Sequence, residues 1–306
     1  DIVIQQYAQQ LLERTIEQKN AKRGAIIMMN PENGEIYCMA IAPDFDLNDP
    51  FTIQNPVLQE QWETMEEAER TQALNQMWRN FCVNDTYEPG STFKIITAAA
   101  ALSEDVVRLD ETFQCSGSLV VADRRIRCHK AGGHGTETFV QGVQNSCNPV
   151  FMTLALRLGA DRFYEYLQAF RFDQKTGIDI SGEAVGIMYN VGDVGPVELA
   201  TMGFGQSIAI TPMQLLRAAA SAVNGGNLIT PHFGTKIQDS EGVTLKTLEF
   251  PVEKGVLTPE VSRTLREVLE TVVSEGGGSK AAITGYRIGG KTATSQKLPR
   301  SAKKYI

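Results

Sequence analysis

The sequence lacks any apolar run long enough to cross a lipid bilayer. A membrane-spanning helix needs about 20 predominantly apolar residues, whereas the most apolar stretch, residues 95–102, has the length of a short core helix. The chain also opens on Asp1-Ile2-Val3 without a signal peptide, which is typical of a piece excised from a longer protein. We therefore expect any membrane anchor to lie upstream, outside this sequence.

Three further scarcities restrict the function. With 29 Lys and Arg against 36 Asp and Glu, the formal net charge is -7, which excludes nucleic acid as a general partner. No glycine-rich phosphate loop follows a strand-like run, so nucleotide chemistry has no support. Five cysteines among 306 residues are too few for a disulfide scaffold. The hydrophobic share of 42% suffices for one large domain or two small ones with a substantial core.

Apolar periodicity predicts the order of the secondary-structure elements. Residues 2–18 have helical spacing, and two apolar runs, 24–29 and 35–40, flank an Asn-Gly step that predicts a β-hairpin. We expect further helices at 58–78, from Ser91 onward, and at 148–158, 160–170, 211–223 and 259–274, strands at 228–238 and 283–289, and an irregular segment at 112–140. This order predicts an α/β sheet layer interrupted by a helical insertion, with a cleft where they meet.

Ser91 and Lys94 form the first pair with catalytic potential. They lie three positions apart, so on a helix both side chains share one face and the amine reaches the hydroxyl. Serine needs a neighbouring base to act as a nucleophile, and burial among the apolar residues after Lys94 would lower the lysine pKa enough for that task. Pro89-Gly90 places Ser91 at a helix N-terminus, which favours developing negative charge. The alternative is that Ser91 only caps the helix.

Ser146-Cys147-Asn148 follows at the start of the helix expected at 148–158. It supplies a second hydroxyl, which could relay a proton between Lys94 and a leaving amine, and a carboxamide that could hydrogen-bond a substrate amide. The alternative is again helix capping, because Ser and Asn are preferred N-caps.

Two lysines compete for the third catalytic position. Lys175-Thr176-Gly177 is a literal Lys-Thr-Gly, but it follows a helix among acidic residues and has the character of a solvated turn. Lys291 follows an apolar strand-like run and two glycines that would let the segment approach the cleft closely. We therefore assign Lys291 to the site.

In this order, Ser-x-x-Lys, Ser-x-Asn and Lys-Thr-Gly resemble the signature of penicillin-binding proteins and serine β-lactamases. The flanking sequence resembles the class B penicillin-binding transpeptidases in particular, and most closely their sporulation-type branch. The matching stretches cover nearly the whole chain and are Tyr87-Glu88-Pro89-Gly90-Ser91-Thr92-Phe93-Lys94, Gly132-Gly133-His134-Gly135, Gln144-Asn145-Ser146-Cys147-Asn148, Met202-Gly203-Phe204-Gly205-Gln206, Thr211-Pro212-Met213-Gln214 and Gly289-Gly290-Lys291-Thr292.

The resemblance implies a fold and a domain layout. The fold is α/β, with an antiparallel sheet flanked by helices plus an all-helical subdomain. Within one transpeptidase domain over 1–306, we expect the sheet layer at about 1–50 and 226–306 and the helical subdomain at about 80–225. Because the family continues beyond the position of Ile306 with more strands and a closing helix, we expect those C-terminal elements to be missing.

The resemblance also implies the chemistry, which needs no cofactor. Ser91 would attack the carbonyl between two terminal D-alanines of a peptidoglycan stem peptide, with Lys94 as general base and Ser146 passing a proton to the leaving D-alanine. The substrate carboxylate would be held by Lys291, Thr292 and Thr294. The backbone N–H groups of Ser91 and Thr294 would form the oxyanion hole. β-Lactams would mimic the D-Ala-D-Ala unit and trap Ser91 as an ester.

Partners and location follow from the same resemblance. The expected ligands are stem peptides and β-lactams, and the expected protein partner is a membrane glycosyltransferase. The domain would work at the extracytoplasmic face of the bacterial cytoplasmic membrane, held by an N-terminal anchor that this chain lacks.

Ala293 departs from the family pattern, which usually has glycine at this position. Its methyl group would lie beside the acylated serine. We therefore expect it to crowd bulky β-lactams and to lower their acylation rate without abolishing it.

A group of cysteines and histidines predicts a structural zinc site. The expected ligands are Cys115, Cys128, His134 and Cys147. Thiolates with imidazole suit a closed tetrahedral site, and some relatives with this pattern carry zinc, which the resemblance brings to this chain. His129 is an alternative fourth ligand in place of Cys147. A Cys115–Cys128 disulfide, or buried free thiols, are the remaining alternatives.

Two other functions use the same three motifs. A β-lactamase would need a base that hydrolyses the acyl-enzyme; Glu183 is the one candidate, and the spacing from Ser146 to Lys291 exceeds that of compact β-lactamases. A β-lactam sensor would acylate and signal, but the Gly-Phe-Gly-Gln stretch favours a transpeptidase. His232, Cys38 and Cys82 are expected to be structural.

Overall fold

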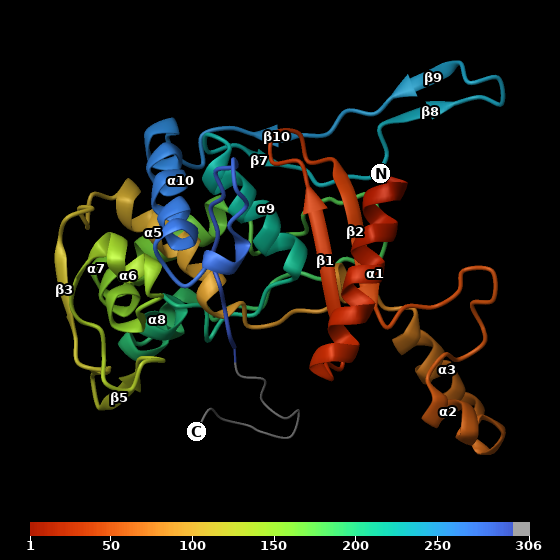
Figure 1. The fold of residues 1–306 in the computed structure, drawn as a ribbon, viewed down its shortest axis with the longest axis horizontal. Coiled ribbons are helices and arrows are strands. Elements are labelled where there is room, and N and C mark those ends of the chain that lie inside the picture. Colours follow the sequence, from red (N-terminus) through yellow and green to blue (C-terminus); the bar gives the residue numbers. More distant parts are fainter. Residues whose placement is uncertain (296–306) are drawn as a thin grey trace.

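The structure is a computed structural model in which residues 1–295 are described (Figure 1). The helices are α1 (Ile2–Lys19), α2 (Pro56–Gln61), α3 (Glu67–Met77), α4 (Phe81–Asn84), α5 (Lys94–Ser103), α6 (Phe139–Gln144), α7 (Asn148–Ala169), α8 (Pro196–Met202), α9 (Pro212–Val223) and α10 (Pro259–Ser274), with short 3-10 turns η1 (Trp62–Thr64), η2 (Gly90–Phe93), η3 (Val191–Asp193) and η4 (Ser279–Ala281). The strands are β1 (Gly24–Met29), β2 (Ile36–Ala42), β3 (Thr112–Cys115), β4 (Ser118–Val121), β5 (Arg124–Arg127), β6 (Gly135–Thr138), β7 (Leu228–Ile229), β8 (Lys236–Gln238), β9 (Thr244–Thr247) and β10 (Val252–Glu253). No helix of this described part has the length and apolar character of a membrane span.

The first helix and hairpin form as the periodicity predicts. The Asp1 carboxylate caps α1 by accepting hydrogen bonds from the backbone of Val3 and Ile4. β1 and β2 pair antiparallel, and alternate residues of β2 are buried. α1 packs on β2 through a small core of Ala8, Leu12, Cys38, Ala40 and Ala42. Figure 1 shows this unit beside the helical centre of the molecule.

The helix predicted at 58–78 is wrong as a single element. After η1 the chain turns extended at Met65, and α3 restarts where the Glu69 carboxylate accepts a hydrogen bond from the backbone of Glu66. This reciprocal cap satisfies the free N–H group that a new helix start exposes. Figure 1 shows α2 and α3 projecting from the rest of the fold.

The main core lies among α5 to α10. The predicted helices at 148–158 and 160–170 are confirmed: α7 consists of two helical stretches that meet at Gly159, whose φ of +74° is not helical. The predictions at 211–223 and 259–274 are confirmed by α9 and α10. The largest side chains buried in this core are Phe93, Phe139, Phe151, Phe163, Phe170 and Phe172.

The segment 112–140 is ordered by strands, which corrects two predictions. β3 pairs antiparallel with β6, and β4 pairs with β5, so the segment is not irregular and the predicted helical subdomain is not all-helical. Each strand has only four residues. So short a strand shows little alternation, which explains why periodicity missed them.

The predicted C-terminal strands form only in part. The run 228–238 breaks into β7 and β8 around Pro231, which has no N–H group to continue a ladder. Residues 283–289 form no strand: their hydrogen bonds make a turn from Tyr286 to Ile283, and these apolar side chains are exposed. The described strands make five two-stranded antiparallel sheets rather than one layer. Residues 296–306 of the predicted sheet layer lie outside the described residues.

Candidate active site

Ser91 lies in η2, and Lys94 is the first residue of α5. The Lys94 backbone N–H donates to the carbonyls of Ser91 and Thr92, closing a tight turn. In a 3-10 turn residues three apart eclipse each other, which places the Ser91 and Lys94 side chains on one face. The capping residue of η2 is Pro89 and that of α5 is Phe93, so the alternative that Ser91 only caps the helix is wrong.

Lys94 is a buried amine surrounded by acceptors. Only 1% of the residue is exposed. Its Nζ lies 2.6 Å from the Ser146 carbonyl oxygen, 2.8 Å from Asn148 Oδ1 and 3.1 Å from Ser146 Oγ. Burial, aided by the nearby charge of Lys291, lowers the pKa of Lys94 to about 7. A large fraction of Lys94 is therefore neutral at neutral pH, as a general base must be.

Ser146 lies in a strained turn between α6 and α7. Its φ is +53°, a left-handed conformation that serine seldom adopts. The residue that caps α7 is Cys147, and it makes no side-chain capping bond. The Ser146 hydroxyl contacts Lys94 instead. The alternative that Ser146 is a helix cap is therefore wrong, and such local strain is typical of functional sites.

The stretch 203–210 supports the Ser91 turn, a role that sequence reasoning did not assign to individual residues. The Gly90 N–H donates to the Gly205 carbonyl at 2.9 Å, and a Cβ on Gly205 would lie 2.1 Å from the Gly90 oxygen. The Glu88 carboxylate accepts a hydrogen bond from the Ser207 N–H at 2.9 Å. The two positive φ angles, +81° at Gly205 and +59° at Ser207, shape this close contact.

Lys291 lies near enough to Lys94 for its charge to lower the pKa of Lys94, and no strand precedes it. Its Nζ donates to the Thr292 carbonyl at 3.1 Å, and burial lowers its pKa to about 8. A Cβ on Gly90 would lie 3.1 Å from the Thr294 carbonyl oxygen, so the segment that ends at Thr294 packs directly on the residue before Ser91. Thr292, Ala293 and Thr294 are exposed.

Lys175 and Glu183 belong to a separate structural turn. Lys175 is exposed. The Glu183 carboxylate accepts hydrogen bonds from the backbone N–H groups of Thr176 and Gly177 and from the Thr176 hydroxyl. With both oxygens engaged, Glu183 serves as a brace for this turn.

The four predicted zinc ligands converge. One donor atom each from Cys115, Cys128, His134 and Cys147 lies within 4.8 Å of the others. Cys115 of β3 pairs with Gly135 of β6, and this pairing brings Cys115 close to His134, the residue before Gly135. All five cysteines are free thiols, so the Cys115–Cys128 disulfide is wrong.

The thiols of the cluster are coupled to each other. The Cys147 thiol hydrogen-bonds to Cys128, which lowers the pKa of Cys128 to about 4 and raises that of Cys147. His129 lies at the edge of the cluster, with its Nδ1 3.8 Å from Cys128 Sγ. It is not among the four converging residues.

The remaining residues that were expected to be structural are buried. Cys38 and Cys82 are 2% and 0% exposed. His232 stacks on Phe250, and its backbone pairs with Gly34 and Ile36 beside β2. These residues hold the fold together away from the catalytic turn.

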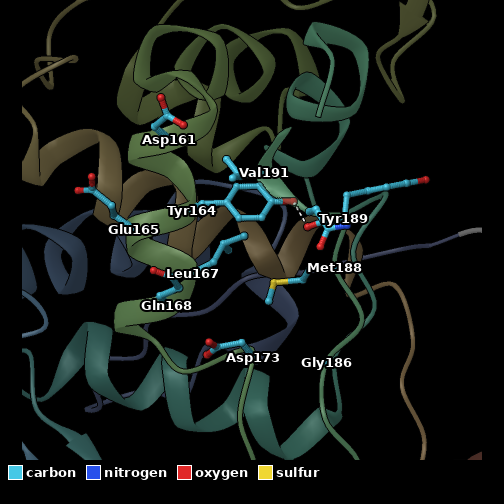
Figure 2. A pocket seen from close by; sticks show the side chains of 11 residues that line it. Asp161, Tyr164, Glu165, Leu167, Gln168, Asp173, Gly186, Met188, Tyr189 and Val191 are labelled. Atoms are coloured by element: carbon cyan, nitrogen blue, oxygen red, sulfur yellow. Dashed lines mark hydrogen bonds between the residues drawn. The ribbon is translucent and has the colours of Figure 1, made fainter. Parts of the chain in front are cut away.

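A cavity of about 610 Å³ lies between α7 and residues 186–191 (Figure 2). The Tyr164 hydroxyl donates to the Tyr189 carbonyl at 2.9 Å across it. Asp161 and Glu165 at its rim are exposed. None of the predicted catalytic or metal-binding residues lines this cavity.

Comparisons with known proteins identify the relatives of this chain. Residues 24–306 match the family model described as penicillin binding protein transpeptidase domain. The chain is 43% identical over 305 residues to stage V sporulation protein D of Bacillus subtilis, which covers 97% of this chain and 44% of that protein. It is 28% identical over 287 residues to peptidoglycan D,D-transpeptidase PbpA of Mycolicibacterium smegmatis, which covers 90% of this chain and 55% of that protein.

A solved structure shows the same fold. It is the D,D-transpeptidase domain of a peptidoglycan glycosyltransferase from Eggerthella lenta, with a TM-score of 0.82, 25% identity, and coverage of 96% of this chain and 70% of that chain. The predicted family fold is therefore confirmed. The chain spans about half the length of the curated relatives it matches.

Proposed function

The chain belongs to the penicillin-binding protein transpeptidase domain family, in the class B group that its motifs predicted, and from that premise we propose that it is a serine D,D-transpeptidase. The observation that carries the proposal is the buried Lys94 amine, held by Ser146 and Asn148 one turn after Ser91. The proposed substrate is the D-Ala-D-Ala end of a peptidoglycan stem peptide. The name of the mycobacterial relative, a peptidoglycan D,D-transpeptidase, supports that choice.

Acylation begins at the Ser91 hydroxyl. Its oxygen attacks the carbonyl carbon of the penultimate D-alanine, and its proton passes to the neutral amine of Lys94. The lowered pKa of Lys94 makes this transfer feasible near neutral pH. The resulting oxyanion is stabilised by the backbone N–H groups of Ser91 and Thr294, a pairing that the packing of the 294–295 segment on Gly90 supports.

Collapse of the tetrahedral intermediate breaks the C–N bond. The terminal D-alanine leaves as an amine and takes its proton from protonated Lys94 through the Ser146 hydroxyl. The 3.1 Å contact between Lys94 Nζ and Ser146 Oγ supports this relay. Asn148 orients Lys94 by accepting a hydrogen bond at Oδ1. The rest of its carboxamide would hydrogen-bond the substrate amide.

Substrate binding falls to the segment from Lys291 onward. Lys291, Thr292 and Thr294 would hold the terminal carboxylate as a charge-assisted pair and through hydroxyl donors. Ala293, between the two threonines, is also exposed, and its methyl group would limit the room beside the acylated serine.

The acyl-enzyme has two fates. An amine of a neighbouring stem peptide attacks the Ser91 ester and gives its proton to Lys94. The bond between the acyl carbon and Ser91 Oγ then breaks, Oγ takes the proton back from Lys94, and the new amide is the cross-link. A β-lactam acylates Ser91 in the same way, but its leaving amine remains tethered, so the ester persists.

Labelling with a fluorescent penicillin tests the proposal and its alternatives. We expect one stable label per chain that Ser91→Ala abolishes. Loss of the label within minutes would indicate a β-lactamase. Both carboxylate oxygens of Glu183 already accept backbone hydrogen bonds, which argues against Glu183 as a deacylating base. Stable labelling without release of D-alanine from a D-Ala-D-Ala peptide and an amine acceptor would indicate a sensor.

We further propose that Cys115, Cys128, His134 and Cys147 bind a structural zinc ion. The donor set fits, because three buried sulfurs and one imidazole converge within 4.8 Å. The depressed pKa of Cys128 agrees with thiolate binding. Bound zinc would tie the strands β3 and β6 to the Ser146 turn and leave the acyl chemistry to Ser91 and Lys94.

The biological setting is proposed from relatives. The identity to a stage V sporulation protein supports a role in spore formation. We propose that the domain acts outside the cytoplasmic membrane on an upstream anchor, with a membrane glycosyltransferase that supplies glycan strands. Co-purification of the full-length protein from membranes with such an enzyme tests this.

A further inference from the structure

Glu137 is a carboxylate buried between the cysteine–histidine cluster and the catalytic turn. It is 3% exposed and lies in β6, opposite Phe113 of β3. Removing a carboxylate from water is costly unless hydrogen bonds or an opposite charge compensate. The partners of its two oxygens therefore indicate what Glu137 does.

The two oxygens face different groups. Oε2 accepts a hydrogen bond from Asn145 Nδ2 at 3.0 Å. Oε1 is buried without a hydrogen-bond donor, and it lies 3.7 Å from Nδ1 of His134, within ion-pair distance. The same Nδ1 also lies 3.7 Å from Cys128 Sγ, so Oε1 faces the cluster side of the imidazole. Glu183, the other buried acid of the described residues, has donors on both oxygens. The free oxygen of Glu137 is thus an unusual feature that points at the cluster.

Each contact of Glu137 leads to a different part of the site. Asn145 ends α6 and directly precedes Ser146, the residue with a positive φ whose hydroxyl and carbonyl contact Lys94. His134 is one of the four converging ligands, and its side chain is 5% exposed. One buried side chain therefore connects the ligand cluster to the proton relay.

We propose that Glu137 is a positioning residue with two tasks. Its Oε1 places a negative charge beside the His134 imidazole at the edge of the ligand cluster, which favours a bound cation, and its Oε2 fixes Asn145 and thereby the Ser146 turn. The first task rests on the proposed zinc site; the second applies to metal-free protein as well. Mutation of the groups that surround metal ligands commonly changes metal affinity by about 10- to 100-fold.

Zinc competition against a chromogenic chelator tests the first task. We expect Glu137→Gln to bind zinc about 10- to 100-fold more weakly than wild type. Its cobalt-substituted form should keep the thiolate absorption, since the four ligands remain. Glu183→Gln is the matched control, a buried acid remote from the cluster, and should bind zinc like wild type. An affinity of Glu137→Gln within twofold of wild type would overturn this task.

Zinc-free protein separates this inference from the zinc proposal. If wild type binds no zinc, the zinc site and the first task both fail, while the second task is decided by acylation rates. We expect Glu137→Ala and Asn145→Ala each to slow penicillin acylation about tenfold, near the value of one hydrogen bond to a charged group. The double variant should be no slower than either single one, and Glu137→Gln, which keeps an acceptor oxygen, should recover most of the rate.

The acylation rate of the double variant, compared with those of the single variants, decides whether the second task is correct. Equal melting temperatures of the variants would show that the rates report geometry rather than unfolding. Additive losses in the double variant would show that Glu137 and Asn145 act independently. That result, or a Glu137→Gln rate as low as that of Glu137→Ala, would overturn the second task.

Discussion

Lys94 Nζ lies 2.8 Å from Asn148 Oδ1, although 54 positions separate the two residues in the chain. The contact aims the amine toward the start of α7 and away from solvent. Burial then lowers the pKa of Lys94 from 10.5 to about 7. The base that Ser91 needs is thus made by the fold.

The pH dependence of acylation follows from that pKa. Lys94 must be neutral to accept the Ser91 proton, so the rate should rise with pH and level off above about 7. Below that value it should fall about tenfold per pH unit. Second-order rate constants with a fluorescent penicillin between pH 5 and 9 measure this; a flat profile would contradict it.

Removal of the base should abolish most of the activity. Lys94→Met keeps the apolar stem but has no amine, so we expect acylation to fall by roughly 10²- to 10⁴-fold. The exposed Lys175 supplies the control: Lys175→Met should acylate like wild type, because its turn does not contact Lys94. Equal losses in both variants would mean that the literal Lys-Thr-Gly motif takes part after all.

Local pattern was enough to predict much of the fold and the site. The helical period gave α1, α9 and α10, and the Asn-Gly step gave the β1–β2 hairpin. The spacing of Ser91 and Lys94 depends only on one turn of backbone, so the pair could be recognised in the sequence. Family motifs then supplied Ser146 and Lys291, which no local rule connects to them.

The features that sequence reasoning missed depend on contacts between distant segments. The strands β3 to β6 are stabilised by pairing across the chain rather than by their own alternation. The apolar run 283–289 resembles a strand, but within the described residues it has no partner strand. The support that Glu88 and Gly205 give to the Ser91 turn had only one sequence signal, the glycines of the 203–205 stretch. The structure explains why glycine is needed there, because Gly205 has a positive φ and contacts Gly90 directly.

Zinc should stabilise the wild-type fold through the four clustered ligands. Metal at about 100 times its dissociation constant adds about 2.7 kcal/mol to the free energy of unfolding, so chelation should lower the melting temperature. Cys115→Ser should melt at the same temperature with and without zinc. Cys38→Ser, a buried thiol in a separate core, should keep the zinc response. Metal content below a tenth of an equivalent in fully active protein would contradict the zinc site.

Ala293 should limit the size of the β-lactam that acylates Ser91. Because one methyl group in a tight site discriminates by roughly tenfold or more, Ala293→Gly should speed acylation by β-lactams with bulky side chains by about that factor. The smallest β-lactams should react at nearly unchanged rates and serve as an internal control. Unchanged rates for every β-lactam would show that position 293 has no steric role.

Gly205 should tolerate no side chain. Its φ of +81° costs an alanine about 1 kcal/mol or more, and a Cβ would also lie 2.1 Å from the Gly90 oxygen, a contact that only backbone movement relieves. Gly242 has a nearly identical φ of +82°, but a Cβ there would meet no atom within 4 Å. Thus Gly242→Ala isolates the conformational strain, whereas Gly205→Ala adds displacement of the residue before Ser91. We expect only Gly205→Ala to slow acylation, by roughly tenfold or more, the cost of one lost hydrogen bond at the turn. Similar acylation rates for the two variants would show that Ser91 does not depend on this contact.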